Sequence, residues 1–125
     1  MNQIKIIVHE ADSSIRDSLE YVLEAAGYYA VLVSNCDNIV ELISKFKPQV
    51  LVLDYIVSGI QSIKTCREVN SLFPHLAVIA LSCNPKISEL YKKAGFDDYI
   101  AKPFDLDHLI DILKKHTDVP KRLLN

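Results

Sequence analysis

Polar and charged side chains follow four apolar stretches of the chain. In chain order they are the acids Glu10 and Asp12, the acid Asp54, the hydroxyl of Ser82 and the ammonium of Lys102. A carboxylate beside a fixed ammonium is kept ionised. An ionised carboxylate among cations and hydroxyl groups can attack a phosphorus atom and hold the transferred oxygens. Provided that the fold gathers these residues, they predict a phosphoryl-accepting site.

Each of these residues also has an ordinary interpretation when it is taken singly. Asp54 is then a solvated acid at the end of a strand, Ser82 a turn or helix-capping residue, and Lys102 a surface lysine. The prediction therefore depends on whether the elements between them bring the side chains to one place.

Five apolar stretches alternate with amphipathic ones along the chain. The stretches predict strands, at residues 4–8, 30–33, 50–53, 77–81 and 99–101. The third, "VLVL", is apolar at every position, as is typical of a central parallel strand covered on both faces. After each strand, apolar residues recur three and four positions apart, which indicates a helix. The pattern predicts an α/β fold with a parallel sheet between two helix layers and right-handed crossovers.

The start of the first helix lies next to the first acid cluster. Asp12 or Ser13 can cap this helix, and Gly27 suits its end. In an open parallel sheet, ligands bind beyond the carboxyl ends of the strands. Since the candidate residues follow strands, we expect them to meet at that edge.

Length and composition limit the possible classes of protein. The chain has 125 residues, which suits one domain, and we expect residues 1–116 to form it and residues 117–125 to be a tail or linker stub. A net charge of −2 predicts no direct binding of nucleic acid. Without a membrane-length apolar run or a signal-peptide pattern, we expect a cytoplasmic protein with no membrane contact. The three cysteines are expected to be free thiols, and the four histidines to lie mostly at the surface or in loops.

Four segments resemble the receiver domain of two-component response regulators of the bacterial type, over about residues 4–113. They are "DSSIRDSLEYVLEAAGY", "FKPQVLVLD", "VIALS" and "AGFDDYIAKPFDLDHL". The resemblance implies a flavodoxin-like (βα)5 three-layer sandwich whose five-stranded parallel sheet has the order 2-1-3-4-5. It also implies a signalling protein and not an enzyme.

The resemblance implies a role for each residue of the candidate site. Asp54 would accept a phosphoryl group from a histidine kinase or a phosphotransfer protein, and Lys102 and Ser82 would contact that group. Tyr99 would follow Ser82 from an outward to an inward rotamer, and Lys102–Pro103 is a candidate cis peptide. The rotamer change of Tyr99 would alter a face formed by the fourth helix, fifth strand and fifth helix. That face would contact a downstream protein target, and a homodimer through it is an alternative.

The chain departs from the family at the metal-binding acids. Members carry two acids after the first strand, and aligned on "DSSIR" these positions are Glu10 and Ala11. A shift of one residue gives His9 and Glu10 instead, but it requires an insertion before the helix. Magnesium is often held by only one or two carboxylates plus water, so losing one weakens its binding or abolishes it. The expected remaining ligands are Glu10, Asp54, the backbone carbonyl of Ile56 and, weakly, Asp12.

Two hypotheses follow for function. The first is a receiver that is phosphorylated on Asp54 and switches its protein contacts. The second is a pseudo-receiver, in which the fold survives as an interaction module that works without phosphorylation; Ala11 favours this alternative. A flavin-binding protein of similar topology has little support, because no phosphate loop rich in Ser, Thr or Gly follows the first strand.

Overall fold

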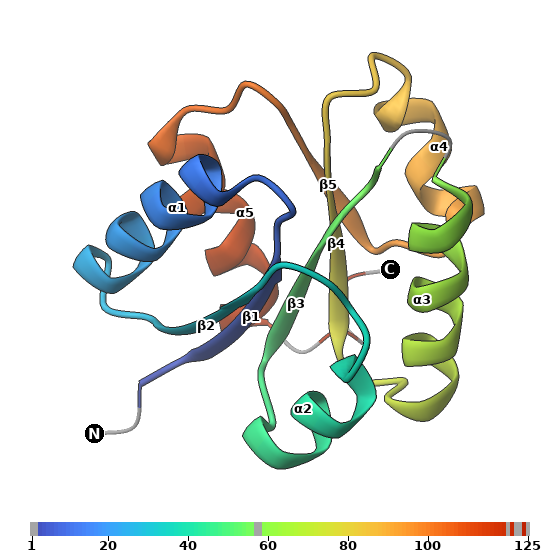
Figure 1. Ribbon diagram of the computed structural model, residues 1–125, viewed down its shortest axis with the longest axis horizontal. Helices are drawn as coiled ribbons and strands as arrows, with labels where there is room; N and C mark the ends of the chain where they lie inside the picture. The colour runs from blue at the N-terminus through green and yellow to red at the C-terminus, as the bar shows by residue number, and fades with distance from the viewer. Residues whose placement is uncertain (1–2, 57–58, 120, 122–123, 125) are drawn as a thin grey trace.

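A computed structural model describes residues 3–56, 59–119, 121 and 124 of the chain (Figure 1). Residues 120, 122, 123 and 125 of the predicted tail lie outside this range. Strands and helices alternate strictly along the described chain. The elements are β1 (Lys5–His9), α1 (Ser13–Ala25), β2 (Tyr29–Val33), α2 (Ile39–Phe46), β3 (Val50–Asp54), α3 (Ile60–Leu72), β4 (Ala77–Ser82), α4 (Ile87–Ala94), β5 (Asp98–Ala101) and α5 (Leu106–Asp118).

The five strands form one parallel sheet in the order β2-β1-β3-β4-β5, which confirms the predicted flavodoxin-like architecture. β3 is central, and all of its residues are buried. In the register of the ladder, Val8 of β1 lies opposite both Leu32 of β2 and Val52 of β3. Asp54 lies opposite Leu81, and Ser82 opposite Ala101. The ends of β3, β4 and β5 are therefore level at the carboxyl edge of the sheet.

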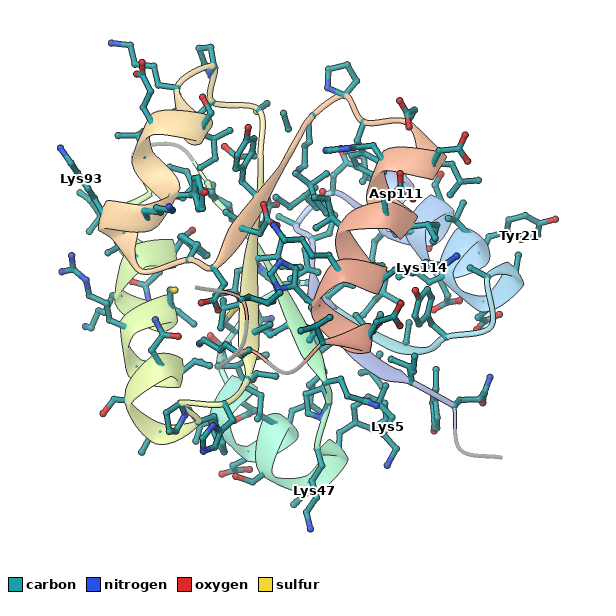
Figure 2. All side chains as sticks on the ribbon, turned by 180° about the vertical axis from the view of Figure 1, so that it is seen from behind. Lys5, Tyr21, Lys47, Lys93, Asp111 and Lys114 are labelled. Carbon is teal, nitrogen blue, oxygen red and sulfur yellow. The ribbon has the colours of Figure 1, made fainter. Side chains whose placement is uncertain are left out.

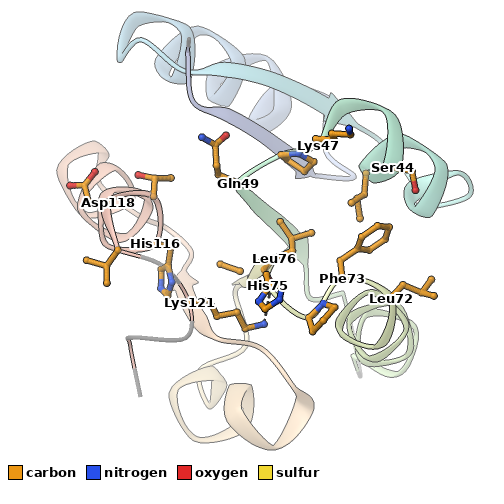
Figure 3. A pocket seen from close by; sticks show the side chains of 16 residues that line it. Ser44, Lys47, Gln49, Leu72, Phe73, His75, Leu76, His116, Asp118 and Lys121 are labelled. Carbon is orange, nitrogen blue, oxygen red and sulfur yellow. Dashed lines mark hydrogen bonds between the residues drawn. The ribbon is translucent and has the colours of Figure 1, made fainter. Parts of the chain in front are cut away.

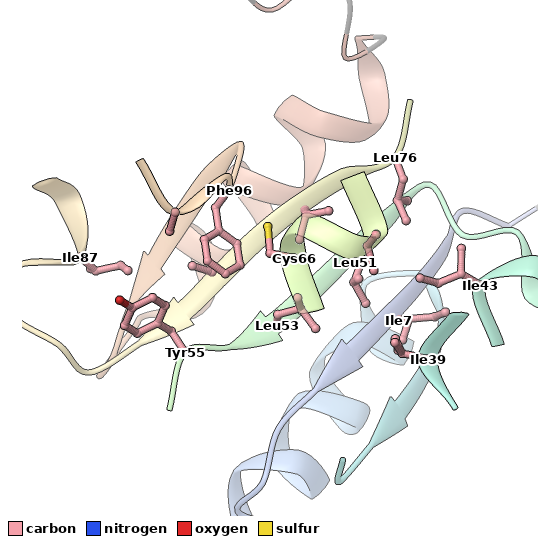
Figure 4. Close-up of a cluster of buried hydrophobic side chains, with 14 residues drawn as sticks. Ile7, Ile39, Ile43, Leu51, Leu53, Tyr55, Cys66, Leu76, Ile87 and Phe96 are labelled. Carbon is pink, nitrogen blue, oxygen red and sulfur yellow. The ribbon is translucent and has the colours of Figure 1, made fainter. Parts of the chain in front are cut away.

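Helices cover both faces of the sheet, with α1 and α5 on one face and α2, α3 and α4 on the other (Figure 1). Successive residues of β3 point to opposite faces, as the pleat requires. Leu51 and Leu53 join the core under α2, α3 and α4, which Figure 4 shows, and Val50 and Val52 join the core under α1 and α5. The apolar run "VLVL" thus contributes side chains to both cores.

Polar groups mark the helix ends and the outer faces. Of the two predicted caps for α1, Asp12 is the one used, since its Oδ1 accepts a 3.0 Å hydrogen bond from the Ile15 N–H. Gly27, just after α1, has a φ of 91°, which favours glycine. Charged side chains such as Asp111 and Lys114 of α5 lie on the outer surface (Figure 2). Among the described residues, no helix is long and apolar enough to cross a membrane.

The expectation for the histidines is wrong at two positions. His9 ends β1 and is 7% exposed, and His116 lies in α5 and is 8% exposed. Burial lowers the pKa of His9 below its usual value, against the opposing effect of Glu10. His116 is buried because its ring reaches inward to a carboxylate of β5. The cysteine expectation is confirmed: all three cysteines are free thiols.

Candidate functional site

Asp54 lies at the carboxyl edge of the sheet, as the last residue of β3, and is 6% exposed. Its Oδ1 lies 3.2 Å from Nζ of Lys102. Its Oδ2 accepts a 3.2 Å hydrogen bond from the backbone N–H of Ala11. An ammonium and an N–H that converge on a carboxylate both stabilise its negative charge. Three segments far apart in the sequence therefore meet at one carboxylate.

Glu10 is the second carboxylate of the site and is almost fully buried, at 1% exposure. Its Oε1 lies 2.6 Å from Nζ of Lys102, and its Oε2 accepts a hydrogen bond from the Asp12 N–H. Apart from the ion pair, Oε1 has no hydrogen-bond partner in the part of the chain that the structure describes. Burial, together with the neighbouring Asp54 carboxyl, raises the pKa of Glu10 although Lys102 and the Asp12 N–H lower it.

Lys102 follows β5 and places its ammonium between the two carboxylates. Its N–H donates to the Ser82 carbonyl at 2.7 Å, which fixes its backbone beside β4, and its peptide bond with Pro103 is cis. Burial alone would lower the pKa of Lys102, but the bonds to Glu10 and Asp54 outweigh burial and raise it. Two buried acids thus share one cation.

Ser82 ends β4 with no exposed surface. Its Oγ accepts a 2.9 Å hydrogen bond from the N–H of Asn84, so in this structure the hydroxyl supports the turn before α4. Tyr99 of β5 is half-buried, and its ring centroid lies 5.0 Å from that of Tyr91 in α4. Ser82 and Tyr99 therefore both contact the α4 side of the molecule, at the edge that also carries Asp54.

Two further residues support the site and were not assigned a role from the sequence. Ser62, in the first turn of α3, donates from Oγ to the carbonyl of Asp54 at 2.7 Å and accepts from the N–H of Ile56 at 3.2 Å. Arg16 of α1 donates to the carbonyls of Glu10 and Ala11 at 2.9 and 3.3 Å. The sequence carried a signal for each residue. A Ser near the start of a helix, such as Ser62, often bonds the backbone, and a cation such as Arg16 is unfavourable at that end of a helix unless it has a partner.

The donor set for a metal ion is sparse. The described residues include no group of three or more acidic, histidine or cysteine side chains that could hold a metal ion. The Asp12 carboxylate caps α1, and the Ile56 carbonyl accepts a 2.8 Å hydrogen bond from the Gly59 N–H. Glu10 and Asp54 remain as side-chain donors. Magnesium tolerates so few because it keeps several waters. The Glu10 Oε1, whose one contact among the described residues is the ion pair with Lys102, fits such a ligand.

Other nucleophiles near the sheet are poor candidates for chemistry. Burial raises the pKa of the Cys36 thiol to about 11 and that of Cys66 to about 12. Both thiols are therefore protonated at neutral pH, and a protonated thiol is a weak nucleophile.

Comparison of the sequence with known proteins gives one family and a set of relatives. The model of the response regulator receiver domain matches residues 6–114. The response regulator MprA of Mycobacterium ulcerans is 31% identical over 109 residues, which cover 86% of this chain and 47% of that protein. The MprA of Mycobacterium bovis is 30% identical over the same shares. The chain spans about half the length of the curated relatives it matches.

Solved structures share the fold closely. A response regulator from Thermotoga maritima superposes with a TM-score of 0.83 at 24% identity, over 94% of this chain and 100% of that one. The chemotaxis response regulator CheY4 of Vibrio cholerae gives a TM-score of 0.80 at 18% identity, over 92% and 99%. At these identities the likeness concerns the fold alone.

Proposed function

Because the chain belongs to the response regulator receiver domain family, we propose that it is a signalling receiver that accepts a phosphoryl group on Asp54. The donor is a phosphohistidine of a histidine kinase or of a phosphotransfer protein. The observation that supports this most is the Asp54 carboxylate itself, held at a strand end between the Lys102 ammonium and the Ala11 N–H. The proposed output is a change in contacts with a protein partner.

The transfer forms one bond and breaks one. A carboxylate oxygen of Asp54 attacks the phosphorus, the P–O bond forms as the P–N bond of the donor breaks, and the donor imidazole leaves with the electron pair. Lys102, 3.2 Å from Oδ1, is close enough to neutralise the charge on the phosphoryl oxygens. The Ala11 N–H orients the other carboxylate oxygen.

We propose that the signal leaves the site through Ser82 and Tyr99. The Ser82 hydroxyl would exchange the Asn84 N–H for a phosphoryl oxygen, and the turn before α4 would change with it. The ring of Tyr99 would then leave its contact with Tyr91 of α4. A new charge at one point can bias such a two-state element. The readout face is α4, β5 and α5, for a downstream target or a second copy.

The metal in this proposal is magnesium, held by Glu10, Asp54 and the carbonyl of Ile56. When bound, it supplies positive charge against the phosphoryl oxygens. Ala11 offers the site only a backbone N–H, and Asp12 is used as a helix cap. We therefore propose that magnesium binds more weakly here than in a receiver with two acids after the first strand.

Intact-mass spectrometry after incubation with acetyl phosphate and millimolar magnesium tests the proposal. We expect the wild-type chain to gain the mass of one phosphoryl group and Asp54→Asn to gain none. Asp107→Asn is the matched control, since Asp107 is an exposed acid in the first turn of α5, and it should behave as wild type. A wild-type chain that gains no mass would contradict the proposal and support the pseudo-receiver alternative. Equal labelling of Asp54→Asn would assign the chemistry to another residue.

A further inference from the structure

A two-part groove lies at the amino edge of the sheet, at the end opposite Asp54, and Figure 3 shows its larger part. Its larger half has a volume of about 790 Å³ and its smaller half about 550 Å³. The two halves share four lining residues: Pro74, His75, His116 and Lys121. Volumes of this size are typical of small-molecule sites. None of the residues of the phosphoryl-accepting site lines it.

The larger half is mainly apolar. Ile43 of α2 and Phe73 and Leu76, which lie between α3 and β4, contribute to its walls. Figure 3 shows the Phe73 ring and the Leu76 side chain on one side of this space, with Gln49 and Asp118 farther along. Ligand pockets combine such apolar walls with a few polar groups that fix orientation. This half therefore suits the apolar body of a small molecule.

The smaller half is mainly basic. Its charged and titratable lining residues are His75, Lys92, Lys115, His116, Lys121 and Asp97. The one acid among them, Asp97, is paired with Lys121: its Oδ2 lies 3.1 Å from Nζ of Lys121 and accepts from the Val78 N–H at 2.8 Å. Lys115 is paired as well, since its Nζ lies 3.3 Å from Oδ2 of Asp98 in β5. Lys92 is exposed, and the described residues give it no ion pair. An anionic group is therefore the complement of this half.

Lys121 and His116 stand where the halves join. Nζ of Lys121 also donates to the Leu76 carbonyl at 3.0 Å, so its side chain crosses from one half to the other. His116 has a side chain that is 2% exposed, and its Nε2 is bonded to Asp98 at 2.8 Å. Its Nδ1 has no partner among the described residues. A buried nitrogen without a protein partner is able to bond a polar group of a ligand or a water.

We propose that this groove binds an amphipathic anion, a small molecule with an apolar body and one acidic group. The body would lie against Phe73 and Leu76, and the acidic group would lie beside Lys92 and Lys115. Charge complementarity and the apolar wall on one side only both point to this class of ligand. The site is separate from Asp54 and does not depend on phosphorylation.

Calorimetric titration with decanoate, below its micelle-forming concentration, tests the proposal on the full chain. Acetate supplies the charge without the body, and decanol the body without the charge. We expect decanoate to bind at least tenfold more tightly than either, and its titration to shift the amide resonances of Leu76 and Lys121. No binding of decanoate, or equal binding of decanol, would overturn the proposal.

Variants at exposed positions identify the basic half. Lys115→Gln and Lys92→Gln should each weaken decanoate binding severalfold, and both positions are exposed enough for the fold to tolerate the change. Lys64→Gln, at an exposed position of α3 outside the groove, is the matched control and should bind as wild type. Decanoate affinity that stays unchanged in both groove variants would contradict the assignment of the acidic group to this half.

Discussion

The two ends of β5 each bring a buried carboxylate against a cation, and the balance of charge differs between them. At the amino end, one acid faces two basic groups, since Asp98 lies 2.8 Å from Nε2 of His116 and 3.3 Å from Nζ of Lys115. At the carboxyl end, two acids share one cation, since Nζ of Lys102 lies 2.6 Å from Glu10 and 3.2 Å from Asp54.

The carboxyl groups respond to this difference in opposite directions. Burial acts to raise the pKa of Asp98, but its bonds to His116, the Tyr99 N–H and Lys115 outweigh burial, and the pKa is lowered. At Glu10, burial and the Asp54 carboxyl outweigh Lys102, and the pKa is raised. The amino end thus stabilises the fold. The carboxyl end holds excess negative charge at a cost to stability, as functional sites often do.

Asp98→Asn should have the largest effect on stability. The substitution removes the charge that His116 and Lys115 both contact, and we expect the free energy of unfolding to fall by about 1.5 to 3 kcal/mol, the usual value for a charged hydrogen bond. Urea unfolding at neutral pH measures it. Asp111→Asn, at an exposed acid of α5, should change stability little. A loss no larger than that of the control would show that the amino-end cluster is not stabilising.

Ala11→Asp should strengthen magnesium binding at the carboxyl end of β5, because it adds a third acid to the site. We expect magnesium affinity, measured by calorimetry, to rise about tenfold, which corresponds to about 1.4 kcal/mol. Asp12→Asn is the control, because Asn keeps the cap of α1 and Asp12 faces its own helix. Unchanged affinity in Ala11→Asp would mean that the acid positions fall on His9 and Glu10 instead.

Glu10→Gln should shift stability in the direction opposite to Asp98→Asn. Since the folded protein disfavours the ionised form of Glu10, removing the charge should raise the free energy of unfolding at neutral pH by about 1 kcal/mol. Urea unfolding again measures it. A destabilised variant would show that the ion pair with Lys102 outweighs burial and the Asp54 charge.

The pH dependence of these differences is the smallest effect and a check on sign. The pKa of Asp98 is lowered in the folded protein. The stability that its ionised carboxylate contributes is therefore present above the unfolded pKa of about 3.9 and is lost as pH falls through the folded pKa. The difference in the free energy of unfolding between wild type and Asp98→Asn should therefore narrow below about pH 4. The pKa of Glu10 is raised in the folded protein, so its ionised form destabilises the fold at neutral pH. The difference in the free energy of unfolding between wild type and Glu10→Gln should therefore narrow as pH falls from neutral toward about 4.3. Unfolding curves across this range that show constant differences would contradict both assignments.

The sequence predicted the five strands to within one residue at each end, because strands buried on both faces are apolar throughout. Most of the differences lie at polar residues, and the others are Ile4, which precedes β1, and Tyr29, which begins β2. His9, Asp54 and Ser82 remain in their strands because the ladder uses backbone groups, which do not depend on side-chain polarity. The sequence left two possible caps for the start of the first helix, Asp12 and Ser13. Only the side-chain geometry of the structure selects Asp12.

The sequence allowed the placement of a site residue to be predicted where the sheet topology alone determines it. Parallel strands end at one edge, so Glu10, Asp54 and Lys102 had to lie near one another, and their contacts agree with that. Their roles in phosphoryl transfer stay predictions. For Ser62 the sequence carried only the general signal of a Ser near a helix start, which does not name the Asp54 carbonyl as its partner. The pairing of Asp98 with His116 was not predictable, because it depends on rotamers and on residues without a shared pattern.

The most direct test of the central claim is an amide NMR spectrum with beryllofluoride, a phosphoryl mimic, and millimolar magnesium. We expect the resonances of Asp54, Ser82 and Tyr99 to shift in the wild-type chain and to stay fixed in Asp54→Asn. The result that would contradict it is a wild-type spectrum that does not change, or one that changes equally in Asp54→Asn.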